Sequence, residues 1–158
     1  NTLAQTQEGR SVLGSKAKIS GLNLYLRLNH WVVSCGGTAL VTPPALAGVE
    51  APSAATIALS ASAFTLTLAD IPADITNLKL IIQASAPQSN GISDAYAKAA
   101  SFGDPETPVT TAIDLKADYD AKNGTPSTSL PKVFVKWFYV NTATGEKSGE
   151  MMALATLA

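Results

Sequence analysis

The chain has 158 residues, of which 15% are charged, 46% are hydrophobic and 6% are aromatic, and its formal net charge is −1. The absence of a basic field excludes a protein that concentrates nucleic acid by charge, and no apolar run reaches the roughly 18 residues of a membrane span. So little charge is unusual for a free cytosolic monomer and suits a surface that packs against copies of itself or other proteins.

Residues 1–37 are predicted to form a helical arm, with a short helix over Asn1–Gln7 and a longer one over Ser20–Cys35. In the longer segment, polar side chains recur at i, i+4, i+7 and i+11, which is one stripe of a helix. These are Asn23, Arg27, His30 and Ser34. Alternating leucines also fit a strand, but a strand would place Tyr25, Trp31 and Val33 on the polar face.

The ends of this helix are marked by Ser20, a candidate N-cap, and by Gly36-Gly37, a C-terminal stop. The segment is apolar almost all round, so we expect it to be covered on more than one side. The chain begins at Asn1 rather than Met, which leaves a cleaved signal, a processed pro-segment and a disordered leader open for what precedes it.

Residues 38–53 are predicted to be a linker, because Pro43-Pro44 and Pro52 favour an extended backbone. From residue 54 to residue 158 the pattern is that of short strands separated by turns. The expected strands are 57–59, 64–68, 78–83, an irregular edge strand at 93–101, 109–113, 132–140 and 151–157. A capped helical turn is expected over Asp114–Gly124. About seven such strands predict an immunoglobulin or fibronectin type III-like β-sandwich.

The segment KVFVKWFYV (132–140) is the clearest strand, with side chains that alternate between two faces. One face is predicted to be sandwich core, and it carries Val133, Val135, Trp137 and Tyr139. The other face carries Phe134 and Phe138 among lysines, which is too apolar for bare solvent. We expect either the arm, through Leu24, Tyr25, Leu28 and Trp31, or a partner subunit to cover it.

No catalytic, cofactor-binding or metal-binding residues are predicted. His30 is the only histidine, which excludes a multi-histidine metal site within one chain. Asp118, Asp120 and Asn123 resemble part of a calcium loop, but the inserted Lys122 opposes a cation and no closing glutamate follows. The remaining carboxylates are scattered over loops, and Cys35, the only cysteine, is expected to be a small buried hydrophobe.

Two stretches resemble a loosely defined family of uncharacterised bacterial and phage-associated proteins. The first is a helix of the form S-G-x-N-x-(aromatic)-x-x-x-N followed by Thr-Pro-Pro, and the second is a Tyr-x-x-x-x-Gly turn, an alternating strand and an Asn-x-x-Thr-Gly loop. The matching residues are Ser20, Gly21, Asn23, Tyr25, Asn29, Thr42, Pro43, Pro44, Tyr119, Gly124, Asn141, Thr144 and Gly145. The resemblance implies a fibronectin-like sandwich and a place in virions, prophage-like clusters or cell-surface assemblies.

These observations favour a structural, non-enzymatic subunit of a virion (capsid, decoration or tail-associated) or of an extracellular surface assembly. It would act by packing against copies of itself or other assembly proteins. The alternative is a glycan- or cell-surface-binding module, for which the candidate aromatics are Trp31, Tyr96, Phe102 and Trp137. Both tryptophans are expected to be buried. An enzyme would need convergent polar groups that the sequence does not display.

Overall fold

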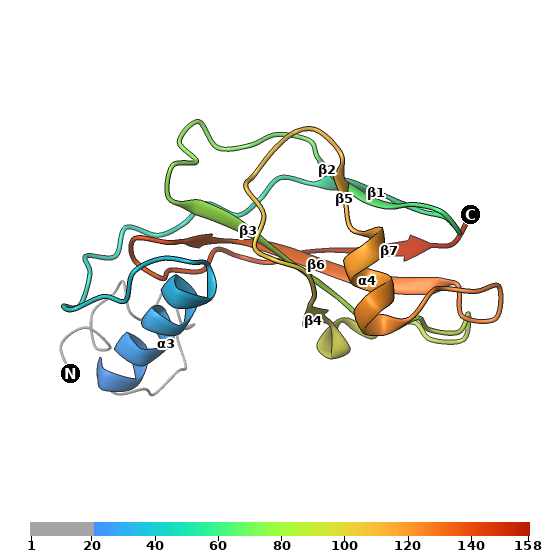
Figure 1. The fold of residues 1–158 in the computed structure, drawn as a ribbon, viewed down its shortest axis with the longest axis horizontal. Helices are drawn as coiled ribbons and strands as arrows, with labels where there is room; N and C mark the ends of the chain where they lie inside the picture. Colours follow the sequence, from blue (N-terminus) through green and yellow to red (C-terminus); the bar gives the residue numbers. More distant parts are fainter. Residues whose placement is uncertain (1–20) are drawn as a thin grey trace.

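The computed structural model describes residues 21–158 and shows a mainly β protein with two antiparallel sheets and a short N-terminal helix (Figure 1). The predicted mainly β class is confirmed. One sheet has the strand order β1-β2-β5, and the other has the order β4-β3-β6-β7. The strands are β1 (Ala55–Leu59), β2 (Phe64–Leu68), β3 (Leu78–Ala84), β4 (Ala100–Ser101), β5 (Ile113–Asp114), β6 (Lys132–Asn141) and β7 (Met151–Thr156). The helices are α3 (Gly21–Ser34), the 3-10 turn η1 (Tyr96–Lys98) and α4 (Lys116–Asn123).

The long strand β6 lies at the centre of the four-stranded sheet. Its residues pair with β3 from Leu78↔Asn141 to Ala84↔Val135, and with β7 from Lys132↔Thr156 to Trp137↔Met151. The expected core face of β6 is buried between the two sheets, against β2 residues such as Phe64 and Leu66. This alternation follows from the two-residue period of a strand, so one face of β6 packs against the other sheet and the opposite face points outward.

Three predicted β elements differ from the structure. Residues 93–101 hold the turn η1 and a two-residue strand, and β5 begins only at Ile113. Residues 116–123 form a complete two-turn helix, α4, whose start is supported by Asp114 Oδ1 accepting the Lys116 N–H at 3.0 Å. The buried Tyr119 of α4 packs edge-on against Phe64 at 4.9 Å between ring centroids and donates its hydroxyl to the carbonyl of Ser85 at 2.9 Å.

The predicted long helix is present as α3 and divides into three stripes. Leu24, Leu28 and Val32, spaced four residues apart, are buried. The predicted polar stripe is exposed. The expectation that the helix would be covered on more than one side is wrong, because Leu22, Leu26 and Val33 are 65%, 56% and 55% exposed. Residues 1–20, which include the predicted first helix and the candidate N-cap Ser20, lie outside the described residues.

The end of α3 is fixed by backbone hydrogen bonds that wrap the last turn. Gly37 N–H donates to the Val32 carbonyl at 2.8 Å, and Gly36 N–H donates to the Val33 carbonyl at 3.0 Å. This pair of bonds is the Schellman pattern, in which a glycine with positive φ ends the helix, and Gly36 has a φ of 78°. The predicted Gly36-Gly37 stop is therefore confirmed.

Residues 38–54 contain no helix or strand and are tied at two points. Near α3, Asn29 Oδ1 accepts the Leu40 N–H at 2.7 Å. Near the β6–β7 turn, the buried carboxylate of Glu146 accepts the Gly48 N–H at 2.9 Å and the Thr144 hydroxyl at 2.9 Å. The segment is thus held to both the helix and the sandwich.

Candidate functional site on the outer face of the four-stranded sheet

The outer face of the four-stranded sheet is the side of β6 that carries Phe134 and Phe138. Both rings are buried, and each is covered by a different element of the same chain. Trp31 of α3 packs edge-on against Phe138, with ring centroids 5.5 Å apart. Tyr96 of η1 packs edge-on against Phe134, with centroids 5.0 Å apart. The helix thus lies over Phe138, whereas the cover of Phe134 comes from a turn within the sandwich.

The predicted arm residues divide into two groups. Leu24 and Leu28 are buried, and Trp31 is partly buried beside the cluster of Cys35, Ile81, Phe138 and Val140. Tyr25 is only half-buried, and its hydroxyl donates to the Leu40 carbonyl, so it holds the linker. Trp137 is buried as expected, but the prediction that both tryptophans are buried is wrong for Trp31, whose edge lines two hollows.

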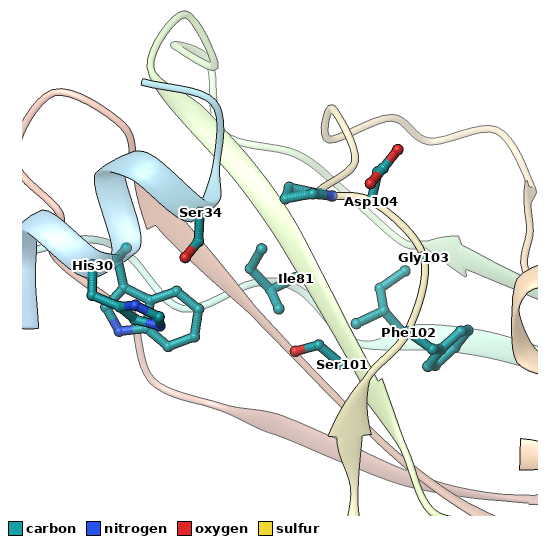
Figure 2. Close-up of a pocket in the computed structure, with 10 residues that line it drawn as sticks. His30, Ser34, Ile81, Ser101, Phe102, Gly103 and Asp104 are labelled. Atoms are coloured by element: carbon teal, nitrogen blue, oxygen red, sulfur yellow. The ribbon is translucent and has the colours of Figure 1, made fainter. Parts of the chain in front are cut away.

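The first hollow is a groove of about 360 Å³ between the C-terminal half of α3 and the loop that follows β4 (Figure 2). Ile81 of β3 lies between its two walls. One wall carries His30, Trp31 and Ser34, and the other carries Ser101, Phe102, Gly103, Asp104 and Pro105. Figure 2 shows the Phe102 ring pointing away from Ile81, consistent with its burial in the core beside Phe64 and Tyr119.

The polar groups of this groove do not form a catalytic arrangement within residues 21–158. No hydrogen bond joins His30 to Ser34, Ser101 or Asp104 in this part of the chain, and all four residues are exposed. A nucleophile needs a base within hydrogen-bond reach, and a perturbed environment to activate it. The groove therefore offers hydroxyl, imidazole and carboxylate groups for binding rather than an assembled reaction centre.

The second hollow, of about 250 Å³, lies on the other side of Trp31, between α3 and the start of β7. Its rim carries Arg27, Lys147 and Glu150. Glu150 pairs with Lys147 and, at 3.6 Å, with Lys136. The hydrogen bond from Lys147, and then the charges of both lysines, lower the pKa of the Glu150 carboxyl, whereas its partial burial opposes the shift. The Lys147 ammonium also lies 3.9 Å from the centre of the Phe138 ring.

The calcium-loop alternative is excluded by the backbone. Asp118 and Asp120 lie within α4, where their side chains do not converge as in an ion-binding loop, and Asp120 pairs with Lys116 one turn earlier. Among residues 21–158, no group of three or more His, Cys, Asp or Glu side chains is arranged to hold a metal ion. Cys35 is buried, and this burial raises the pKa of its thiol although the charge of Lys79 acts in the opposite direction.

Sequence reasoning missed the glycine that seats α3 on the sandwich. A Cβ atom on Gly145, in the turn after β6, would lie 2.1 Å from the Leu28 carbonyl oxygen, so the backbone of α3 rests directly on this turn. It also missed the exposed apolar side chains of β7, Met152 and Leu154. The absence of any charge in MMALAT (151–156) was the available signal for the latter. None of the described helices combines the length and the apolar character needed to cross a membrane.

Comparison with known proteins gives no match, either to a protein-family model or to a curated sequence.

Proposed function

We propose that this chain is a structural, non-enzymatic subunit of a virion or of an extracellular surface assembly, and that it acts by packing against copies of itself or other assembly proteins. One observation carries the proposal, namely the apolar outer stripe of α3. At about 100° per residue, Leu22, Leu26 and Val33 fall within about 40° of one another around the helix axis. All three are more than half exposed.

This outer stripe is separate from the face that α3 uses to hold itself on the sheet. The buried residues Leu24, Leu28 and Val32 point toward β6, and the outer stripe points away from it. Val41, which is 94% exposed, follows Leu40, the residue that Asn29 holds against α3. Contiguous exposed apolar side chains on a soluble domain mark contact surfaces, and so little charge elsewhere leaves few competing polar features.

We further infer that the sandwich is of the immunoglobulin or fibronectin type III kind. The support is the division into three and four strands, with the first strand beside the second in one sheet and the third beside the sixth in the other. The β-sandwich plan is used widely for modules that are built into larger surfaces, and it carries many unrelated functions. The fold is therefore compatible with an assembly role, and the α3 stripe is what argues for it.

The test is sedimentation velocity on the full chain over a range of concentrations, together with a search for the protein in particles or filaments of its source. We expect species larger than the monomer and recovery with a particle. The matched variants are Leu26→Gln, on the outer stripe, and Arg27→Gln, on the polar stripe beside it. Leu26→Gln should weaken assembly and Arg27→Gln should not. A strict monomer at every concentration, with no particle in the source, would refute the proposal.

A glycan-binding module is the second candidate, and the groove beside Trp31 is the observation that favours it. Carbohydrates are bound by an aromatic face together with hydroxyl-binding polar groups, and here Trp31 stands near Ser34, Ser101 and Asp104. A glycan array on the wild type and a Trp31→Leu variant tests this function. A glycan signal that disappears with Trp31 would favour the binding module, and no signal on any glycan would reject it.

A further inference from the structure

The outer edge of β7 has backbone groups that no other strand of residues 21–158 uses. Leu157 N–H donates to the Pro131 carbonyl at 2.8 Å, which shows that the odd-numbered residues of this strand bond with β6. Backbone groups alternate sides along a strand. The N–H and C=O groups of Met152, Leu154 and Thr156 therefore point away from β6, toward an edge where β7 has no neighbour within the described sheets.

The opposite side of the sandwich is protected in the ways that natural sheets protect their edges. There β4 and β5 have only two residues each. The helix α4 lies beside them, and its Lys122 donates to the carbonyl of Ser101. Short edge strands, lysines and covering helices all prevent a second chain from pairing. The β7 edge has none of these devices, since MMALAT contains no charged residue and no proline and pairs without a bulge.

The side chains along this edge are also suited to contact. Met152 and Leu154 are 52% and 44% exposed on the outer face of the sheet. The nearest charge on that face, Lys136 of the neighbouring strand, is already paired with Glu150. The other long edge, β1, exposes only Thr56 and Ala58, which are smaller. An uncharged apolar edge of six residues is the kind that pairs with another strand.

We propose that the β7 edge pairs with the β7 edge of a second copy of this chain, antiparallel and about a two-fold axis. This inference rests on the proposed function, because it names one contact through which the subunit packs against its own kind. With the axis at Leu154, Met152 faces Thr156 of the other copy and Leu154 faces its own equivalent. That register satisfies every outward backbone group of Met152, Leu154 and Thr156, and a shift by one pair leaves one of them unbonded.

Two-fold symmetry is the reason to choose a second copy over an unrelated extended segment. An antiparallel edge is complementary to itself, because each residue offers both the donor and the acceptor that its symmetry mate requires. The pairing would join two four-stranded sheets into one continuous sheet of eight strands. It would also cover Met152 and Leu154 on both copies, which removes apolar surface from water at the same contact.

The test compares the wild type with Leu154→Lys and with Thr56→Lys in the full chain, by sedimentation velocity and by hydrogen exchange. Leu154→Lys places like charges directly opposite each other at the axis, so the dissociation constant should rise by roughly 100-fold. Thr56→Lys adds the same charge to the β1 edge and should leave the constant within about threefold, as expected for a charge outside the contact. Circular dichroism shows whether each variant is folded.

Hydrogen exchange on the wild type needs no variant. The amides of Met152, Leu154 and Thr156 should exchange more slowly as protein concentration increases, because pairing protects them. If the wild type associates but Leu154→Lys and Thr56→Lys behave alike, or the three amides stay unprotected, the β7 pairing is wrong and the proposed assembly function stands. If the three amides are protected to the same extent in a monomer, another segment occupies the edge and the pairing is also wrong. A wild type that never associates and is found in no particle refutes both.

Discussion

The substitution Gly145→Ala is predicted to be the most damaging single-methyl change in the described part of the chain. Gly145 has a φ of +74°, which costs a residue with a Cβ about 1 kcal/mol. The added Cβ would also lie 2.1 Å from the Leu28 oxygen and 2.5 Å from the Leu28 carbonyl carbon. Both atoms belong to the backbone of α3, so no side-chain rotation relieves the clash.

The size of the effect follows from the way in which the clash can be relieved. Either the turn moves away, or α3 lifts from the sheet and exposes Leu24, Leu28 and Val32. Each of these side chains is stabilised by about 1.5–3 kcal/mol through burial, which makes complete detachment cost more than a partial shift of the turn. We therefore expect the free energy of unfolding to decrease by about 3–5 kcal/mol, at the upper end for a single substitution.

Gly124→Ala is the matched control. Gly124 has a φ of +79°, and a Cβ there would meet no atom within 4 Å. Its expected loss is the backbone term alone, about 1 kcal/mol. The assay is urea unfolding followed by tryptophan fluorescence, because Trp31 reports on the seating of α3 and Trp137 on the sandwich core. If Gly145→Ala and Gly124→Ala lower stability equally, the direct seating of α3 on this turn is refuted.

Three other changes probe the interior and the charged rim. Glu146→Gln should lower the free energy of unfolding by about 1–3 kcal/mol, because the buried carboxylate accepts the Gly48 N–H, whereas Glu50→Gln, at an exposed position, should change it by less than about 0.5 kcal/mol in the same urea titration. The pKa of Glu150 is lowered from 4.5 by Lys147, so its ion pair contributes stability above pH 4.5 that is lost as the pH falls through the folded-state pKa. Glu150→Gln should remove that part of the acid dependence of the melting temperature, and an unchanged acid dependence would exclude a stabilising pair. Cys35 should react with a thiol reagent much more slowly in the folded protein than in urea, since its burial hinders access and raises the thiol pKa; equal rates would show that the site is open.

Strand β6 could be predicted from the sequence because its environment is regular over ten residues. One face packs on the opposite sheet and the other carries aromatics between lysines, so the period of two is written into the sequence. The cover of the second face was harder to predict. Tyr96, which lies over Phe134, comes from the weakly patterned segment 93–101, where no local periodicity indicates what the turn will contact.

Helix α3 shows what a local pattern contains and what it lacks. The polar stripe distinguishes helix from strand, and it predicts which residues are exposed. It does not say which of the remaining apolar residues will find a partner, and the prediction of cover on several sides was wrong because Leu22, Leu26 and Val33 stay exposed. Gly145 and Glu146 were not predicted as important, because their partners Leu28 and Gly48 lie far earlier in the chain.

The seat of α3 and the surfaces proposed for assembly depend on different residues, and this separation makes the proposals testable. The seat uses Gly145 and the inner stripe of the helix, whereas the proposed contacts use the outer stripe and the β7 edge. Changes at Leu154 or Leu26 remove no buried contact of the described fold, so they should alter association with little loss of stability. Gly145→Ala should do the reverse at the β7 edge, since the β6–β7 ladder lies beyond the turn that it disturbs. A loss of both properties in every variant would mean that folding and association are coupled, as in an obligate oligomer.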